Sequence, residues 1–317
     1  MVVRFWGTRG SIPVTLTSTA IKRKLIDGLL KSRGQPLGTA AEVEAFVERE
    51  CGAPYTFGGN SSCVEIELGT DAYVLCDLGS GVRAFGNQVL ARHGPAKSNT
   101  FHVFMSHMHW DHIMGFPFFV PAYIPGNTVR IYGCHAALGD AFRRQHGAPS
   151  FPVDFDQLGS TIEFVRLEPG TRYEIADLGV TAMRQRHGGD SYGYRFERGG
   201  KVLVYSTDSE HKLEDPKETG EFVALFRDAD LVIFDAMYSL ADAITVKEDW
   251  GHSSNIVGVE LCQMARAKHL CLFHHEPAHD DEQLRAVLRD TRRFEELTRG
   301  EVPLQVSAAY DGMEIVV

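Results

Sequence analysis

The chain has 317 residues, of which 42 are acidic and 32 are basic, for a formal net charge of −10. This acidic balance excludes the overall positive charge that is typical of nucleic-acid-binding proteins, although it allows a local basic groove. The length suits one large α/β domain or two smaller ones. No apolar run approaches membrane-spanning length, so we expect no membrane contact. The six cysteines include no CxxC pair, which predicts reduced thiols in a cytoplasmic protein.

Short β-branched or aromatic runs recur along the chain and are bounded by Gly, Asp or Pro, which is typical of strands. In chain order, the expected strands are Val2–Trp6, Cys63–Leu68, Ala72–Cys76, Phe101–Ser106, Thr128–Tyr132, Ile162–Val165, Val180–Arg184, Tyr192–Phe196, Val202–Ser206, Leu231–Phe234 and His269–Phe273. Helical spacing of apolar residues follows at Ser253–Ala267 and Asp281–Leu297. This mixture predicts an α/β fold.

The segment from about Thr15 to Cys51 differs from the rest because it carries two amphipathic helix patterns. The first has an apolar stripe at Ile21, Leu25 and Leu29, and the second is acidic on its polar face. A Gly- and Pro-containing stretch separates them. Two interpretations remain open: a helical hairpin packed on the core, or a lid or dimer arm.

Four potential metal ligands lie within six residues, directly after the expected strand that ends at Ser106. They are His107, His109, Asp111 and His112. Imidazole and carboxylate together suit Zn²⁺, and Mn²⁺ and Fe²⁺ are also compatible. A polar turn that merely contains histidines would rarely cluster ligands this densely. The sequence therefore predicts a metal site where this strand leaves its sheet.

Three further ligand-type residues follow apolar strands later in the chain. They are His187, Asp208 and His274, and His275 is a neighbour of the last. Each alone has an ordinary explanation, because a strand-end Asp is often a turn former and a strand-end His is often a surface residue. Together with the first cluster they predict one shared site at one end of a sheet.

The ordered set His-x-His-x-Asp-His, then His, Asp and His, resembles the metallo-β-lactamase superfamily. The run Asp77-Leu-Gly-Ser-Gly81 is similar to the first motif of that family, in which a strand-end Asp supports the metal loop. The resemblance implies a four-layer αββα sandwich. It also implies that residues 1–317 form a single domain, with a helical insertion at about 15–51.

The resemblance further implies a two-metal site, with zinc as the favoured ion and manganese or iron as alternatives. His107, His109 and His187 would hold one ion, and Asp111, His112 and His274 would hold the other. Asp208 would bridge the two ions. The choice of His274 over His275 stays open at this stage.

Two more residues favour the phosphodiesterase branch of the superfamily, which includes tRNase Z and the ribosyl cyclic phosphate phosphodiesterases. Asp235 ends an apolar strand, and His252 precedes a helix. In that branch an acidic residue orients a His near the scissile phosphate, so the resemblance implies catalytic roles for His252, Asp235 and Asp111. The alternative is that His252 is only a polar residue before a helix capped by Ser253.

The glycine-rich loop before the second expected strand is also similar to small bacterial members of this branch. Its Asn60, Ser61 and Ser62 offer hydrogen-bond donors to phosphate oxygens, which predicts substrate contacts. The alternative is an ordinary Gly-rich loop.

We therefore expect a metal-dependent hydrolase that cleaves small or cyclic phosphodiesters with a metal-bridged hydroxide. A thioesterase- or lactonase-type hydrolase and an RNA-processing endonuclease are the alternatives. The expected partner is a small phosphodiester, nucleic acid and membranes are not expected, and a homodimer is compatible with the segment at 15–51.

Overall fold

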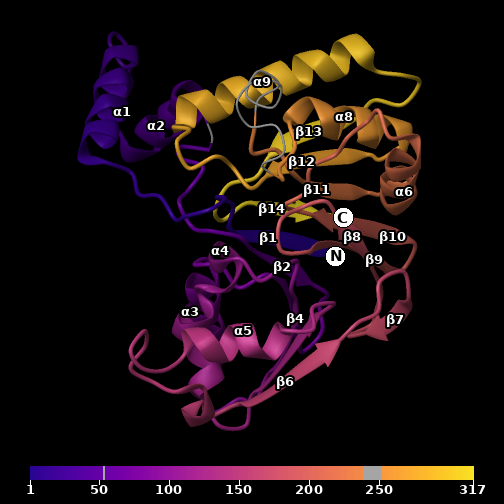
Figure 1. Cartoon of the computed structure of the whole chain (residues 1–317). Helices are drawn as coiled ribbons and strands as arrows, with labels where there is room; N and C mark the ends of the chain where they lie inside the picture. Colours follow the sequence, from indigo (N-terminus) through magenta and orange to yellow (C-terminus); the bar gives the residue numbers. More distant parts are fainter. Residues whose placement is uncertain (53, 239–250) are drawn as a thin grey trace.

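The computed structural model describes residues 1–52, 54–238 and 251–317 (Figure 1). Two seven-stranded sheets face each other, and helices pack on their outer faces. The α/β class and the four-layer αββα sandwich expected from the sequence are confirmed.

The first sheet contains β1 (Val2–Gly7), β2 (Cys63–Glu67), β3 (Ala72–Cys76), β4 (Thr100–Phe104), β5 (Thr128–Gly133), β6 (Thr161–Arg166) and β14 (Glu314–Val316). The second contains β7 (Arg172–Ile175), β8 (Leu178–Gln185), β9 (Ser191–Arg198), β10 (Lys201–Ser206), β11 (Leu231–Asp235), β12 (His269–Phe273) and β13 (Gln305–Ala308). Every strand expected from the sequence is present, with small shifts at its ends. The short strands β7, β13 and β14 were not expected, because they carry few apolar residues.

Strand order decides where the candidate site can form. The first sheet runs β14-β1-β2-β3-β4-β5-β6, and the second runs β13-β12-β11-β10-β9-β8-β7. Strands β3 to β6 are parallel, as are β10 to β13. The carboxyl ends of parallel neighbours lie at the same edge of a sheet, which is where open α/β sheets bind ligands.

Alternation along the strands builds the layers. In β3, Val74 and Cys76 face the core between the two sheets, whereas Leu75 faces the helices outside. In β11, Leu231 and Ile233 enter the core between the sheets. Successive side chains of a strand point to opposite faces, so a strand covered on both faces is apolar throughout. The carboxyl-terminal residues of these buried strands are therefore held in fixed positions.

The helices lie on the two outer faces of the sheets. The α-helices are α3 (Val82–His93), α4 (Trp110–Ile113), α5 (Leu138–Gln145), α6 (Pro216–Phe226), α8 (Asn255–Met264) and α9 (Asp281–Thr298). The short 3₁₀-helices are η2 (Phe116–Phe118), η3 (Val120–Tyr123) and η4 (Phe155–Gln157). Figure 1 shows α6, α8 and α9 on the second sheet, with α3 and α5 on the first. The two helices expected late in the chain are present as α8 and α9. The N-cap of α8 is Ser254 and not Ser253.

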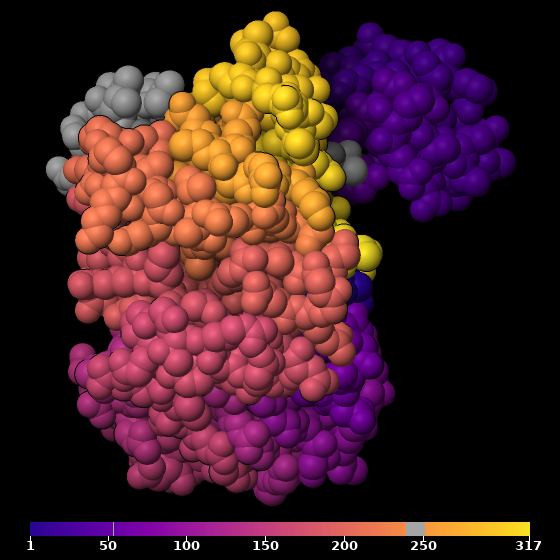
Figure 2. All heavy atoms as spheres, turned by 90° about the vertical axis from the view of Figure 1, so that its right-hand side faces the viewer, coloured from indigo at the N-terminus to yellow at the C-terminus, as the bar shows by residue number. Residues whose placement is uncertain are grey.

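Residues 15–51, which we call the helical arm, contain α1 (Ser18–Lys31), α2 (Ala40–Phe46) and one π-helical turn, η1 (Val47–Cys51). Figure 2 shows this indigo segment projecting from the body of the molecule. Both helices start at a threonine N-cap, Thr17 and Thr39. We retain the proposal that residues 1–317 form one domain with the arm as an insertion.

Two further expectations concern the chain as a whole. All six cysteines are free, and only Cys51 is not buried. Within the described ranges, no helix combines the length and the apolar character needed to cross a membrane.

Candidate metal centre

The loop that leaves β4 brings four potential ligands together. Ser106, two residues after β4, donates from its backbone N–H and its hydroxyl to the two carboxylate oxygens of Asp77, at 2.8 and 2.7 Å. The chain then turns through His107 and His109 into the single helical turn α4, which carries Asp111 and His112. Asp77 at the end of β3 therefore anchors the loop, as the resemblance implied.

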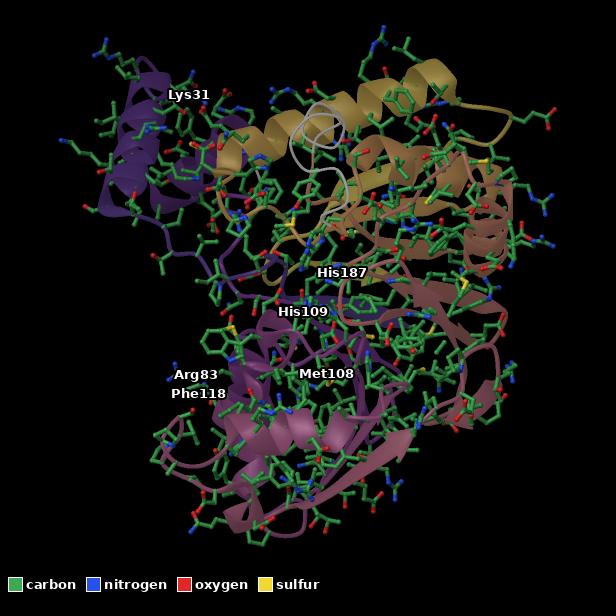
Figure 3. All side chains as sticks on the ribbon, in the orientation of Figure 1. Lys31, Arg83, Met108, His109, Phe118 and His187 are labelled. Atoms are coloured by element: carbon green, nitrogen blue, oxygen red, sulfur yellow. The ribbon has the colours of Figure 1, made fainter. Side chains whose placement is uncertain are left out.

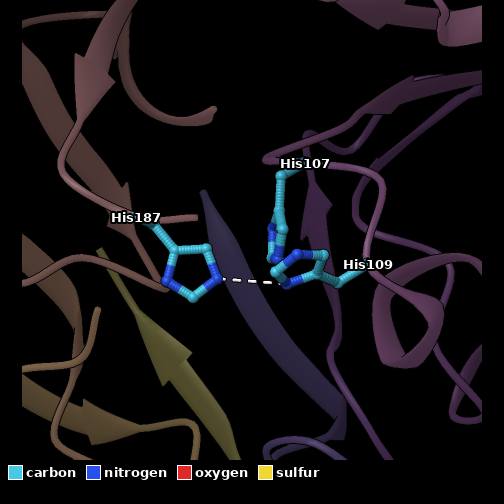
Figure 4. Close-up of side chains that lie close together, drawn as sticks. All are labelled: His107, His109 and His187. Atoms are coloured by element: carbon cyan, nitrogen blue, oxygen red, sulfur yellow. Dashed lines mark hydrogen bonds between the residues drawn. The ribbon is translucent and has the colours of Figure 1, made fainter. Parts of the chain in front are cut away.

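The first group of candidate ligands comprises His107, His109 and His187 (Figure 4). His187 follows β8 in the second sheet, and its Nε2 lies 3.1 Å from Nδ1 of His109. In Figure 3, His109 and His187 face each other from the two halves of the sandwich. His107 Nε2 is buried and has no hydrogen-bond partner among the described residues. An unpartnered buried nitrogen of this kind is a free ligand atom.

The second group comprises Asp111, His112 and His274. His274 directly follows β12, and its Nε2 lies 3.3 Å from both Asp111 Oδ2 and His112 Nε2. Asp111 Oδ2 and His112 Nε2 are 3.2 Å apart. His275 is not part of this group, because its Nε2 hydrogen bonds to the carbonyl of Ala309 at 2.7 Å.

Asp208 lies between the two groups and offers one carboxylate oxygen to each. Its Oδ1 is 3.2 Å from the Nε2 atoms of both His112 and His274. Its Oδ2 is 3.6 Å from His107 Nε2 and 3.7 Å from His187 Nε2. This two-sided placement is the geometry that a bridging carboxylate requires.

The donor set fits a pair of divalent ions. In a tetrahedral site with metal–nitrogen distances near 2.1 Å, neighbouring ligand atoms are about 3.4 Å apart. The separations of 3.1 to 3.7 Å in the two groups lie around this value. Imidazoles dominate the first group, and the second adds the Asp111 carboxylate, a mixture that suits zinc.

Charge on the first group and on the two carboxylates is arranged as metal ligation requires. Burial lowers the pKa values of His107, His109 and His187, so these imidazoles are neutral and keep a lone pair. Burial alone would raise the pKa of Asp208, but the surrounding histidines hold it well below its usual range. Burial alone would also raise the pKa of Asp111, but His112 and His274 lower it below its usual value. Both carboxylates are therefore anionic. Burial alone would lower the pKa of His112, but the Asp208 and Asp111 carboxylates raise it, so an ion bound there would displace a proton.

Outer contacts fix the orientation of two imidazoles. Asp77 Oδ2 lies 2.7 Å from His112 Nδ1 and accepts a hydrogen bond from the Tyr205 hydroxyl at 2.7 Å. The Nδ1 atom of His187 lies 2.7 Å from the carbonyl of Gly251. Such partners leave the other ring nitrogen free for a metal. Tyr205 and Gly251 were not predicted as part of the site, since nothing in their local sequence pattern distinguishes them.

His252 and Asp235 form a pair beside the cluster. His252 Nδ1 lies 2.8 Å from Asp235 Oδ2, and the His252 ring stacks on His274 with centroids 5.1 Å apart. Backbone N–H groups of Ser209 and Met237 donate to the Asp235 carboxylate and fix it. Burial alone would lower the pKa of His252, but the charge of Asp235 raises it to about 9.

Asn60, Ser61 and Ser62 lie in the loop that precedes β2. Ser61 and Ser62 are fully buried. The Ser61 hydroxyl donates to the carbonyl of Asp111 at 2.8 Å, and the Asn60 amide donates to Asp311 at 3.0 Å. The Ser61 contact supports the metal loop, and the substrate contacts of these three residues stay a prediction.

A cleft lies away from these ligands. It has a volume of about 320 Å³ and is bounded by the helical arm and the start of α9.

Comparison with known proteins decides the family. Residues 72–275 match the model of the beta-lactamase superfamily domain. The chain belongs to this superfamily. The matched range of the superfamily member contains all the candidate ligands and the pair formed by Asp235 and His252, but not the helical arm.

Sequence relatives of this superfamily member include enzymes named Ribonuclease Z. The protein from Crocosphaera subtropica is 24% identical over 319 residues, covering 83% of this chain and 98% of that protein. The protein from Acaryochloris marina is 26% identical over 281 residues, covering 73% of this chain and 85% of that protein. These names conflict with our expectation that nucleic acid is not a partner.

Solved structures share the fold of this superfamily member at low identity. The metallo-β-lactamase fold protein YhfI from Bacillus subtilis superposes with a TM-score of 0.65 at 17% identity, covering 99% of this chain and 98% of that one. The short form of human tRNase Z superposes with a TM-score of 0.62 at 19% identity, covering 100% of this chain and 99% of that one. Zn²⁺-bound PqqB from Methylobacterium extorquens superposes with a TM-score of 0.62 at 14% identity, covering all of both chains. The protein is thus a metal-dependent hydrolase that binds divalent metal.

Proposed function

We propose that this hydrolase is a two-metal phosphodiesterase that acts on small or cyclic phosphodiesters. The observation that carries the proposal is the hydrogen bond between His252 and Asp235, placed beside the ligand cluster and stacked on His274. A thioester expels a thiolate, which leaves without a proton, whereas the alkoxide expelled from a phosphodiester or a lactone needs a proton donor.

The two groups of ligands would each hold one ion. His107, His109 and His187 would hold the first, and Asp111, His112 and His274 the second, with one Asp208 oxygen on each side. Zinc is the ion that these donors favour, and manganese and iron are the alternatives. When bound, such ions lower the pKa of a shared water and take up charge on phosphate oxygens.

His252 is proposed to protonate the leaving oxygen. Asp235 accepts from Nδ1 of His252, which fixes the ring and leaves Nε2 as the nitrogen that meets substrate. As the phosphorus–oxygen bond breaks, the proton on Nε2 passes to the departing alkoxide. Asp235 is a positioning residue, because it is fully buried and held by backbone N–H groups.

RNA processing is the second candidate, because the sequence relatives carry the name Ribonuclease Z. The net charge of −10 opposes it, since phosphate contacts supply most of the affinity for nucleic acid. Exposed Trp110, between His109 and Asp111, offers a flat apolar surface that would suit a nucleoside in either substrate.

The test is a substrate panel assayed with protein loaded with Zn²⁺ or Mn²⁺. It contains bis(p-nitrophenyl) phosphate, a 2′,3′-cyclic nucleotide, a structured RNA with a 3′ extension, a lactone and a thioester. We expect turnover of the first two. Cleavage of the RNA far above the small diesters would select the second candidate. Turnover of only the lactone or the thioester would overturn the phosphodiesterase assignment.

A further inference from the structure

Helix α1 exposes an apolar surface that nothing in the described structure covers. None of its residues is buried. Its large apolar side chains, Ile21, Leu25, Ile26, Leu29 and Leu30, are 46 to 70% exposed. Scattered exposed apolar residues are normal, but a contiguous set on one short helix marks an interaction surface.

The apolar residues of α1 are turned away from the body. The polar contacts of the helix with the rest of the chain include those of Lys24 and Lys31, whose ammonium groups donate to the carbonyls of Tyr55 and Glu50 at 2.6 and 3.2 Å. Arg23 pairs with Asp280 at 4.0 Å. Lys24 also pairs with Asp281 at 2.6 Å. Residues seven apart lie on one face of a helix. In a monomeric protein the apolar face would lie against the core instead.

The arm carries unpaired charges of both signs. Lys22 on α1 and Arg33 in the turn that follows this helix are exposed and make no ion pair with any described residue. Glu44 and Glu48, one turn apart on α2 and η1, are exposed and also lack a cationic partner within the described ranges. The surface is therefore basic on one helix and acidic on the next, and each charge has its complement in another arm.

We propose that a second copy of this chain covers the arm in a two-fold dimer. In such an interface the same patch serves both subunits, so apolar α1 residues meet their equivalents. Lys22 and Arg33 of each subunit then face Glu44 and Glu48 of the other. An anionic membrane or a nucleic acid would suit the basic helix alone but would be repelled by the acidic one and by the net charge of −10.

The contacts between arm and body are consistent with this role. A cleft of about 320 Å³ separates α1 from the start of α9, and polar contacts such as Lys24–Asp281 cross it. The large apolar side chains of α1 make none of these polar contacts and are 46 to 70% exposed. They are free to pack against another arm.

The first experiment measures mass by light scattering over the micromolar range, using the full-length, metal-loaded protein. We expect twice the 35.2 kDa of one chain. The double variant Leu25→Asp/Leu29→Asp should be monomeric with unchanged circular dichroism and metal content. Leu297→Asp is the matched control, since Leu297 is also a highly exposed leucine of a helix but lies at the far end of α9. The control should remain dimeric.

The second experiment swaps charges. Lys22→Glu/Arg33→Glu should weaken the dimer at least tenfold, and adding Glu44→Lys/Glu48→Lys should restore it. A monomeric wild type, or a dimer insensitive to the Leu25 and Leu29 changes, would overturn the proposal. Binding of the wild type to anionic phospholipid vesicles, lost in the leucine variant, would replace the second copy with a membrane. These readouts do not depend on any phosphodiesterase activity.

Discussion

At the scale of single residues, adjacent histidines in this chain have different surroundings. His274 has a positive φ of 57°, and its Nε2 lies within 3.3 Å of Asp111, His112 and Asp208. His275 points to the other side of the turn, where it is buried against the carbonyl of Ala309. The backbone turn at the end of β12 thus sends one ring into the candidate site and the next into the core.

This difference provides a matched test of the metal site. Metal analysis of wild-type protein purified without chelator should give about two equivalents per chain. His274→Gln should lose close to one equivalent and most activity, because it removes one ligand of the second group. His275→Gln keeps a donor for the Ala309 carbonyl, so it should retain both. Equal metal loss in the two variants would contradict the assignment of His274.

The proposed proton donor has its own signature. His252→Ala should keep both metals but lower kcat by about 10²–10⁴, the usual contribution of a positioned acid. The loss should be smaller for p-nitrophenyl esters than for alkyl esters, because p-nitrophenolate departs without a proton. A uniform loss would indicate phosphate positioning instead. If activity on every phosphodiester were retained, His252 would have no part in the reaction.

At the scale of elements, parallel strands gather the distal ligands. Strands β10, β11 and β12 are parallel neighbours, and Asp208, Asp235 and His274 lie at or beyond their carboxyl ends. The register of these strands brings together residues that are far apart in sequence. The carboxyl ends of these strands are held in place because the strands are buried on both faces.

The edge of the same sheet contains a group that makes stability depend on pH. His269 at the start of β12 is buried, its Nε2 lies 2.7 Å from the Ser307 hydroxyl of β13, and burial lowers its pKa to about 4. An unfolded chain would bind the proton near pH 6.5. Between these values only the unfolded state is protonated, so the free energy of unfolding should decrease as pH falls from about 6.5 to 4.

The contribution of His269 should be roughly 3 kcal/mol over that window. Urea denaturation of the wild type and of His269→Gln at a series of pH values measures it. The variant, which cannot titrate here, should show a shallower decrease by about this amount. Identical pH profiles for the two proteins would contradict the assignment.

At the scale of the whole molecule, the candidate ligands join the two sheets. His107, His109, Asp111 and His112 follow a strand of the first sheet, whereas His187, Asp208 and His274 follow strands of the second. Ions held between them would cross-link the sandwich. Because only the folded chain assembles this set, metal affinity adds directly to folding stability.

Metal removal should therefore lower the melting temperature. If free metal exceeds its Kd 1,000-fold, binding contributes about 4 kcal/mol at one site. Calorimetry before and after chelation, followed by return of Zn²⁺, should show a fall and then a recovery of the midpoint. His275→Gln should respond as the wild type does. An unchanged midpoint after complete metal loss would contradict a cross-linking role.

The sequence by itself determined the residue types and the local frame of the site. Dense ligands directly after an apolar strand predicted the metal loop, and apolar strands ending in single ligands predicted Asp208 and His274. These signals are local, because strand burial and strand ends follow from residues adjacent in the chain. The strands β7, β13 and β14 were missed because pairing with neighbouring strands, and not their own composition, holds them in place.

Only the tertiary structure decided which of these residues meet. Strand order and the packing of one sheet against the other decide three features of the site. They direct His275 away from the ligands, they place Asp208 between the two groups, and they bring Asp77 into contact with the metal loop and with β10. The burial of Ser61 and Ser62 depends on the same packing. Distances between residues far apart in sequence are set by the register of strands, which no local pattern contains.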